Sequence, residues 1–193
     1  MKIITICREY GAGGHTVGRA VAERLGIEFY DKDIIRTAAK ASGLDIETIE
    51  RDEERISGAE AFFRSISPVS YQYKDALFAY EREAIIKLAE RGPCVILGRC
   101  ADAILREVNV TKLDVFLTAH EVYRARRTGE LLNTDDPDVI ARAMKKTDHE
   151  RRTYYERLTG LKWADVNNFD LCLDTGTLGK ELCVQLICEA AEK

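Results

Sequence analysis

Hydrophobic residues gather in short, nearly continuous runs, and the segments between the runs repeat apolar positions with a helical period. The runs cover residues 2–7, 94–98, 113–118 and 170–174. Each run has the length of a strand and is apolar at consecutive positions, which is typical of strands covered on both faces. A short fifth strand is predicted at residues 29–30. Strands separated by helices predict a parallel sheet with right-handed crossovers and helices on both faces, a three-layer α/β fold.

Amphipathic helices fill most of the segments between the strands. Residues 16–25 and 74–90 each place their apolar side chains on one helical face, and the segment after Gly179 repeats the pattern. Residues 42–73 follow no clean period, and we interpret them as an insertion beside the active cleft. The sequence contains no repeat, low-complexity tract or linker, so we expect residues 1–193 to form a single domain.

The charge of the chain is acidic overall but basic in one segment. The 193 residues include 29 Lys or Arg and 33 Asp or Glu, which gives a formal net charge of −4. This balance argues against general nucleic-acid binding, which needs a basic surface to displace phosphate counterions. Residues 119–162 hold ten basic and eight acidic residues, a local charge of +2. One segment therefore concentrates arginine within an acidic protein.

The lack of recognisable targeting signals and the spacing of the cysteines predict a cytoplasmic protein. No apolar run is long enough to cross a bilayer, and the residues after Met1 show no secretory leader, so we expect no membrane partner and a cytoplasmic location. The six cysteines stand singly without a Cys-x-x-Cys pair. We expect them to be reduced thiols packed in the interior. The sequence does not predict an oligomeric state.

The first predicted strand leads into a glycine-rich stretch, REYGAGGHT at residues 8–16, and then into a helix. Phosphate loops have this layout, because glycines let backbone N–H groups converge on phosphate oxygens at a helix N-terminus. The candidate phosphate-binding residues are Gly11, Ala12, Gly13, Gly14, His15 and Thr16. Gly14 stands where such a loop carries its lysine, and His15 where it carries its serine. Ordinary strand-to-helix turns also use glycine, so the loop by itself leaves both interpretations open.

A dinucleotide-binding turn is a third interpretation of the loop. Asp31 follows Gly11 by twenty residues, the spacing at which a ribose-binding acid would lie. Two features oppose this interpretation. The third glycine of the dinucleotide pattern is replaced by Thr16, and residues 8–10 separate the strand from Gly11, where a dinucleotide turn would be tight.

Five further stretches extend the comparison beyond the loop. They are EFYDKDIIR at 28–36, VILGRCADAIL at 95–105, LDVFLTAHEVYRARR at 113–127, DHERRTYY at 148–155 and DLCLDTGTL at 170–178. Together with residues 4–26, they resemble segments of cytidylate kinases in the same order. The resemblance is closest to the cytidylate kinase-like family, whose members often open with SREYGSGG. It covers most of the chain apart from residues 42–73.

The resemblance implies a P-loop kinase fold with a small helical lid at about residues 119–162. It also implies ATP and Mg²⁺ as cofactors and phosphoryl transfer to a nucleoside monophosphate. The lysine-free loop leaves two alternatives open. One is a non-catalytic nucleotide-binding or regulatory protein on a kinase fold, and the other is a kinase for another small metabolite.

The resemblance places an arginine-rich lid around the donor phosphates. Arg124 and Arg127 open the lid, and Asp148 with Arg151 reproduces the Asp-x-x-Arg spacing of its return arm. Arginine suits this site because its planar fork grips phosphate oxygens in pairs. Asp148 and Arg151 lie within one helical turn, so we predict that the aspartate fixes an arginine that reaches the donor phosphates. We further hypothesise that Arg8, or a lid arginine, supplies the cation that Gly14 lacks.

The candidate acceptor-binding residues are Asp31, Arg36 and Arg99. Arg99 directly ends an apolar strand, where open α/β sheets place their ligands, and the resemblance puts monophosphate binding there. Asp31 matches an aspartate of the family and could instead cap the following helix. Thr16 is a candidate for contact with Mg²⁺, although we favour a role in capping the first helix.

Overall fold

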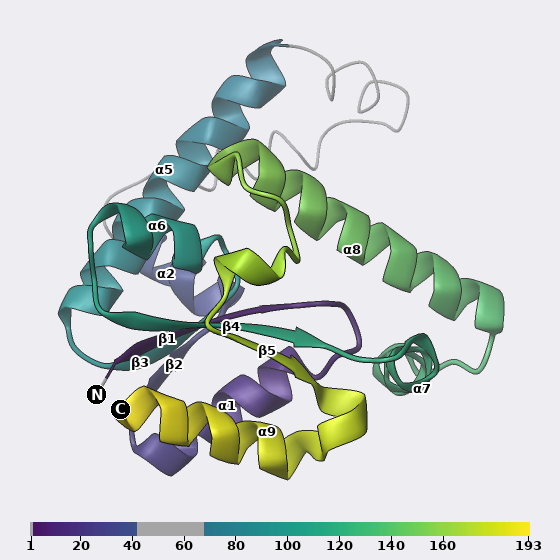
Figure 1. The fold of residues 1–193 in the computed structure, drawn as a ribbon. Helices are drawn as coiled ribbons and strands as arrows, with labels where there is room; N and C mark the ends of the chain where they lie inside the picture. The colour runs from purple at the N-terminus through teal and green to yellow at the C-terminus, as the bar shows by residue number, and fades with distance from the viewer. Residues whose placement is uncertain (1, 42–67) are drawn as a thin grey trace.

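The computed structural model describes residues 2–41 and 68–193, which form a five-stranded sheet between layers of helices (Figure 1). The strands are β1 (Ile3–Arg8), β2 (Glu28–Tyr30), β3 (Cys94–Leu97), β4 (Lys112–Thr118) and β5 (Leu171–Asp174). Their order is β2-β3-β1-β4-β5, and every neighbouring pair is parallel. The three-layer α/β fold is therefore confirmed, including the short strand at residues 29–30.

The helices are arranged in two layers and one projecting hairpin. Those described are α1 (Gly14–Leu25), α2 (Lys32–Ala41), α5 (Pro68–Glu90), α6 (Ala101–Glu107), α7 (Glu121–Leu132), α8 (Pro137–Thr159) and α9 (Thr175–Glu192). Helices α1 and α9 cover one face of the sheet, while α2, α5 and α6 cover the other (Figure 1). Helices α7 and α8 pack together as a hairpin, in which α7 lies beyond the carboxyl ends of the strands and α8 runs back over the body of the protein. Helix α6 was not predicted, and α5 begins within the stretch expected to be an insertion, whose residues 42–67 lie outside the described residues.

Each face of the sheet carries its own apolar core. On one side Ile4 and Ile6 of β1 pack with residues of α1 and α9. On the other side Ile3 and Cys7 pack with residues of α5, α6 and α8. Because successive strand residues point to opposite faces, both sets must be apolar, and this explains the continuous hydrophobic runs. The two cores fix the strand ends on which the candidate site is built.

Aspartates set the starts of three helices near the carboxyl edge of the sheet. Asp31 accepts hydrogen bonds from the backbone N–H groups of Asp33 and Ile34, at 3.1 and 3.2 Å, and so caps α2. Asp136 caps α8 and Asp174 caps α9 in the same way. Each such cap stabilises its helix by about 1 kcal/mol. The alternative that Asp31 is a helix cap is thus confirmed.

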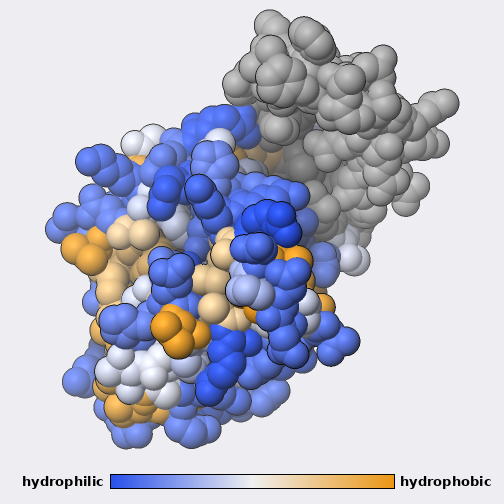
Figure 2. All heavy atoms as spheres, turned by 90° about the vertical axis from the view of Figure 1, so that its right-hand side faces the viewer, coloured by the Kyte–Doolittle hydropathy of each residue, from blue (hydrophilic) through white to orange (hydrophobic). Residues whose placement is uncertain are grey.

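The structure can be compared with the expectations about membrane segments and cysteines. No helix in the described part of the chain is both long enough and apolar enough to cross a bilayer. All six cysteines are free thiols and five are buried, but Cys172 on the edge strand β5 is exposed, so the expectation of an interior thiol is wrong there. The face toward which α7 projects is mostly hydrophilic, with scattered apolar side chains (Figure 2).

Candidate active site

The glycine loop connects β1 to α1 at the carboxyl edge of the sheet. Gly11 and Gly13 have left-handed φ angles of 80° and 76°, a region that favours residues without a Cβ. Gly13 is the N-cap of α1, and no side chain caps the first N–H groups of this helix. An uncapped helix start after a glycine turn presents N–H donors to an anion. The loop therefore has the geometry of a phosphate site.

A cavity of about 280 Å³, the loop cavity, opens above this turn. Its lining includes Gly11, Gly13, Gly14, His15, Thr16, Asp31 and Arg127. Thr16 is exposed in the first turn of α1 and is not the cap that we expected, because Gly13 holds that position. Ala12 does not contribute to the lining. It is fully buried, and its carbonyl accepts a hydrogen bond from the Thr175 hydroxyl at 2.9 Å.

Arg8, the last residue of β1, fills the space where the lysine of a phosphate loop would begin. A Cβ added to Gly14 would lie 2.7 Å from Cγ and 3.2 Å from Cβ of Arg8. A Cβ added to Gly98 would collide with Nη1 of Arg8. The stem of Arg8 thus lies against the glycine loop and its guanidinium against the turn after β3. Arg8 and a side chain at residue 14 cannot both occupy this space.

Arg8 is a half-buried cation beside two other cations. Burial, together with the charges of Arg151 and Arg99, lowers the pKa of Arg8 from 12.5 to about 10. The guanidinium still carries its proton at neutral pH. Among the residues that the structure describes, no carboxylate forms an ion pair with Arg8. A half-buried charge without an ion-pair partner is costly, so this position favours a bound anion.

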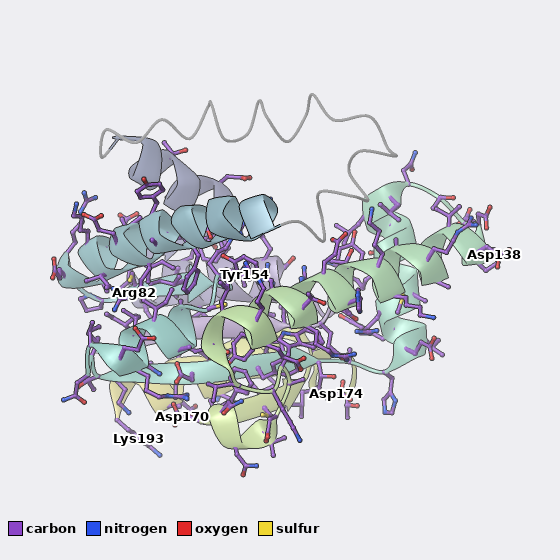
Figure 3. All side chains as sticks on the ribbon, turned by 90° about the horizontal axis from the view of Figure 1, so that it is seen from above. Arg82, Asp138, Tyr154, Asp170, Asp174 and Lys193 are labelled. Carbon is purple, nitrogen blue, oxygen red and sulfur yellow. The ribbon has the colours of Figure 1, made fainter. Side chains whose placement is uncertain are left out.

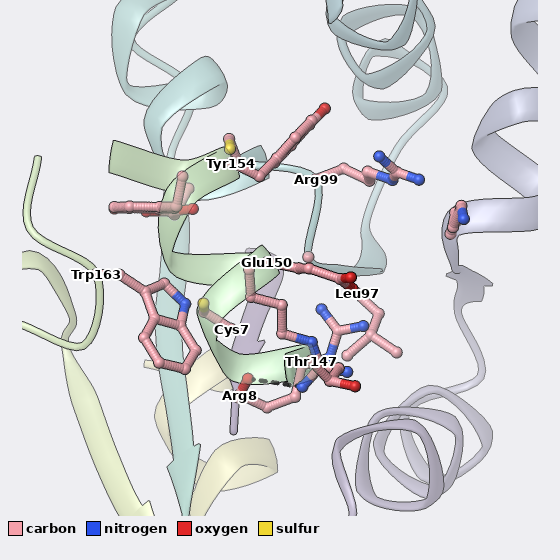
Figure 4. Close-up of a pocket in the computed structure, with 14 residues that line it drawn as sticks. Cys7, Arg8, Leu97, Arg99, Thr147, Glu150, Tyr154 and Trp163 are labelled. Atoms are coloured by element: carbon pink, nitrogen blue, oxygen red, sulfur yellow. Dashed lines mark hydrogen bonds between the residues drawn. The ribbon is translucent and has the colours of Figure 1, made fainter. Parts of the chain in front are cut away.

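A second cavity of about 320 Å³ adjoins the loop cavity at the end of β3, and we call it the β3 cavity. Both cavities are lined by Arg8, Lys32, Leu97 and Arg151. Those four residues therefore form a common wall. The remaining lining of the β3 cavity includes Cys7, Arg99, Asp102, Tyr154, Tyr155 and Trp163. Figure 4 shows Trp163 and Arg99 on opposite sides of this cavity.

Arg99 is held in the β3 cavity by a buried carboxylate of α5. Its backbone has a left-handed φ of 56°, which is strained for a residue with a side chain. Its Nη1 lies 3.3 Å from each carboxylate oxygen of Glu81, which is fully buried. The hydroxyl of Tyr154 donates a hydrogen bond to Glu81 at 2.6 Å, and the guanidinium of Arg99 lies 5.3 Å from the Tyr154 ring. The ion pair and the hydrogen bond to Glu81 both use Nη1 of Arg99, so they do not occupy its Nε and Nη2 edge.

Asp148 attaches the α7–α8 hairpin to the glycine loop. It accepts a hydrogen bond from the N–H of Tyr10 at 2.7 Å and pairs with Nη1 of Arg124 at 2.7 Å. Arg124 also lies 3.3 Å from Glu9. The arginine fixed by Asp148 is therefore Arg124 of α7, whereas the Asp-x-x-Arg spacing predicted one on α8. Arg124 joins the hairpin to the loop. Its charge is balanced by two carboxylates, so it is a weaker candidate for binding a ligand than Arg151.

Arg151 is the hairpin residue that reaches both cavities. Its Nη1 donates a hydrogen bond to the carbonyl of Arg8 at 3.0 Å, and its guanidinium lies 5.6 Å from the Tyr10 ring. Burial lowers the pKa of Arg151 as well. Arg127 lies farther out on the loop cavity, where it pairs with Glu130 at 3.1 Å. The hairpin thus contributes two arginines to the cavity linings, and Arg151 is the one in the common wall.

The remaining predicted residues lie at the start of α2. Asp31 lines the loop cavity, with its second carboxylate oxygen 3.4 Å from Nε2 of His15. It is absent from the lining of the β3 cavity, although the resemblance assigned it to the acceptor. Arg36 lies on α2, and its side chain falls outside the described part of the structure.

Two carboxylates of the site, Glu81 and Asp102, were not selected from the sequence. Glu81 shares a helical face with Ile85 and Leu88, and an acidic residue on an apolar face is a signal that could have identified it. Asp102 lies in the first turn of α6, where it is 4% exposed and accepts a hydrogen bond from the Tyr155 hydroxyl at 2.6 Å. Its role depends on the cavity, which the sequence does not show.

The donor set suits a nucleotide-bound metal ion better than a resident one. No group of three or more His, Cys, Asp or Glu that could hold a metal occurs in the described residues. Mg²⁺ in kinase sites is held chiefly by substrate phosphates, water and one or two protein oxygens. Thr16 and Asp31 provide such oxygens on the loop cavity. These residues therefore fit Mg²⁺ that arrives with a polyphosphate.

The parallel sheet, the uncapped glycine loop and the helical hairpin define an α/β protein of the P-loop kinase type. The sequence matches the cytidylate kinase-like family over residues 3–177, so the chain belongs to that family. A shikimate kinase from Ruegeria pomeroyi is 33% identical over 153 residues, which are 74% of this chain and 67% of that protein.

Solved structures share the fold over the whole chain. An uncharacterized protein from Eubacterium ventriosum has a TM-score of 0.78 at 24% identity, covering 100% of this chain and 99% of its own. A shikimate kinase from Bacteroides thetaiotaomicron has a TM-score of 0.54 at 20% identity, with coverage of 100% and 99%. At these identities the similarity establishes the architecture.

Proposed function

We propose that this protein transfers the γ-phosphoryl group of ATP to a small phosphorylated acceptor, in the simplest case a nucleoside monophosphate. The observation that carries the proposal is the common wall between the loop cavity and the β3 cavity. A transferred group must pass where donor and acceptor meet, and the wall there contains Arg8 and Arg151. Phosphoryl transfer depends mainly on alignment and on neutralising the charge of the moving group, and both arginines are suited to that task.

The loop cavity would hold the donor. Backbone N–H groups at the start of α1 would bind the phosphate chain, and Arg127 lies at the rim of the same cavity. Mg²⁺, when bound with the nucleotide, would offset charge on the donor phosphates and draw on Thr16 and Asp31 for protein oxygens. Arg8 would take the place of the missing lysine, since its stem fills the space beside Gly14.

The β3 cavity would hold the acceptor phosphate through the Nε and Nη2 edge of Arg99. An oxygen of that phosphate would form a bond to the γ-phosphorus while the bond between this phosphorus and the β,γ-bridging oxygen breaks. The products are ADP and a diphosphate. Because the acceptor oxygen is already anionic, the step needs no general base, and cations at the common wall would reduce the repulsion between the two phosphorylated substrates.

A hydroxylated metabolite is the second candidate acceptor, and the similarity to a shikimate kinase favours it. Transfer to a neutral hydroxyl requires removal of a proton, which a carboxylate near the reacting oxygen would accept. Asp31, which lines the loop cavity with Glu9 and Asp33, does not line the β3 cavity, whereas three arginines do. The phosphorylated acceptor therefore remains the better supported proposal.

The decisive experiment measures ADP formation with ATP, Mg²⁺ and a panel of the common nucleoside monophosphates, with shikimate as the hydroxyl acceptor. We expect transfer to at least one monophosphate. Arg8→Ala, Arg99→Ala and Arg151→Ala should each lower kcat/KM by about 100-fold or more, given the value of charge-assisted phosphate contacts in enclosed sites. Arg24→Ala is the matched control. Arg24 lies in the last turn of α1, at the end away from the glycine loop, and pairs with Glu181 of α9.

Each outcome separates one interpretation from the others. Transfer to shikimate alone would establish the hydroxyl acceptor. ATP binding without transfer to any acceptor would indicate a nucleotide-binding protein without catalysis. Neither binding nor transfer, judged by the absence of a nucleotide-induced thermal shift, would refute the proposed function.

A further inference from the structure

Two buried carboxylates line or support the β3 cavity, and their surroundings differ in one respect. Glu81 has Arg99 as a cationic partner. Asp102 is 4% exposed, and no Lys, Arg or His among the described residues forms an ion pair with it. Burial of an unpaired carboxylate is costly, so a cavity beside it is a candidate site for a group that compensates its charge.

Among the described residues, the cavity wall around Asp102 supplies a single side-chain hydrogen-bond donor to its carboxylate. The neighbours that line the cavity with it are the thiols of Cys7 and Cys100 and the rings of Tyr155 and Trp163. The Tyr155 hydroxyl donates to Oδ2 at 2.6 Å. A carboxylate has about four acceptor positions, so most of its capacity is not used by the described side chains. Burial raises the pKa of Asp102, as expected for this apolar wall.

The charge pattern of the cavity orients an acceptor. Arg8, Arg99, Arg151 and Lys32 attract a phosphate group, whereas the carboxylates of Asp102 and Glu150 repel one; of these two, Asp102 is the buried one. Asp102 and Trp163 both act on the thiol of Cys7, and Figure 4 shows Trp163 across the cavity from Arg99. An acceptor bound with its phosphate on the arginines therefore presents its other end to Asp102.

We propose that Asp102 is a specificity residue that accepts hydrogen bonds from hydroxyl or amino groups on the part of the acceptor remote from its phosphate. The ligand class is a phosphomonoester that carries such donors. This inference rests on the proposed function, because it assumes that the arginines bind the acceptor phosphate. A purely structural role, in which Asp102 only fixes Tyr155 and α8, is the alternative that the experiment must exclude.

The test measures dissociation constants by calorimetry for inorganic phosphate, CMP, UMP and dCMP. CMP and UMP differ in an exocyclic amine, and CMP and dCMP differ in a ribose hydroxyl, so the two pairs distinguish the two sources of donor. We expect CMP to bind at least tenfold more tightly than phosphate to the natural protein. In Asp102→Asn this preference should fall about tenfold, the value of a hydrogen bond to a charged group, while phosphate binds as well or better because a repelling charge is gone.

Two further variants separate recognition from folding. Tyr155→Phe leaves the carboxylate of Asp102 in place and should keep the preference for CMP over phosphate. If Asp102 only fixes Tyr155 and α8, Tyr155→Phe should instead lose this preference as Asp102→Asn does. Asp114→Asn is the matched control, since Asp114 is also 4% exposed and accepts a hydroxyl hydrogen bond, from Thr5 at 2.6 Å, but lines neither cavity. It should lower the melting temperature without changing the preference.

The outcomes distinguish this inference from the proposed function. Phosphate binding with no preference for the nucleotides, or a preference that survives Asp102→Asn, would overturn the role of Asp102 and leave the kinase proposal standing. A loss of preference in Tyr155→Phe as large as in Asp102→Asn would also overturn it. Absence of both phosphate binding and phosphoryl transfer would refute the proposed function and the subsite together.

Discussion

Replacing Gly14 with alanine tests whether Arg8 occupies the place of the phosphate-loop lysine. The new Cβ would lie 2.7 Å from Cγ, 3.2 Å from Cβ and 3.3 Å from Cδ of Arg8. Arg8 has little room to retreat, because β1 fixes its backbone and its Nη1 already packs against Gly98. Overpacking of this kind costs about 1–3 kcal/mol. Alanine is favoured over glycine within a helix by about 0.5–1 kcal/mol.

These two effects predict opposite signs in two backgrounds. In the natural protein the steric cost should prevail, and Gly14→Ala should lower the free energy of unfolding by about 1–2 kcal/mol. In the Arg8→Ala background the contacts with Cγ and Cδ are absent and only the 3.2 Å approach to Cβ remains, so the same change should raise it by less than about 1 kcal/mol. The coupling energy between the two sites is then about 1–3 kcal/mol, well above the error of additivity for independent positions.

Urea denaturation of the natural protein, both single variants and the double variant measures this cycle. ATP binding by the same four proteins shows whether displacement of Arg8 also disturbs the loop cavity. If Gly14→Ala changes the unfolding free energy equally in both backgrounds, the stem of Arg8 does not fill this space and the explanation for the missing lysine fails.

Three further predictions concern carboxylates of the site. Glu81→Gln should raise the acceptor KM about tenfold and leave the KM for ATP within twofold, because Arg99 loses its charged partner. Steady-state kinetics tests this, with the exposed Glu83→Gln as control. Parallel changes in both KM values would contradict it. Asp148→Asn should lower the free energy of unfolding by about 1–3 kcal/mol, because Arg124 loses the closer of its two charged partners. An unchanged urea midpoint would refute the assignment. Burial raises the pKa of Asp102 above its ordinary 3.8, so the folded state holds this proton more tightly than the unfolded chain. The contribution of Asp102 to stability is thus complete below about pH 3.8 and is lost as pH rises through the raised pKa. The stability of the natural protein relative to Asp102→Asn should therefore fall from pH 4 upward. A flat or rising difference would contradict this.

The sheet could be predicted from the sequence because its signal is local. Strands covered on both faces are apolar at consecutive positions, and Cys94–Leu97 has no alternative explanation at that length. The position of Arg99 followed from the same logic, since the end of a buried parallel strand lies at the ligand edge of the sheet. Helix α6 was missed because seven residues directly after a strand carry too few apolar positions to show a period.

The chemistry of the site was less accessible because it depends on contacts between distant segments. The Asp-x-x-Arg spacing indicated a pair within α8, but Asp148 reaches Arg124 on another helix. The absence of a lysine at Gly14 was visible, whereas the stem of Arg8 that excludes a side chain there was not. Glu81 illustrates the same limit, since only the tertiary contact with Arg99 shows why a fully buried acid is tolerated.

Helix α8 contributes side chains to the linings of both cavities. It extends from the hairpin tip near Asp138 back over the body of the protein to Tyr154 (Figure 3), and with 23 residues it is about 35 Å long. Within one turn it carries Arg151, which lines both cavities, and Tyr154, which donates a hydrogen bond to Glu81, the partner of Arg99. A small tilt of this rod therefore displaces groups on both sides of the common wall at once. If donor and acceptor bind as proposed, the first to arrive would set the geometry that the second one meets, and by linkage each would change the affinity for the other by the same factor.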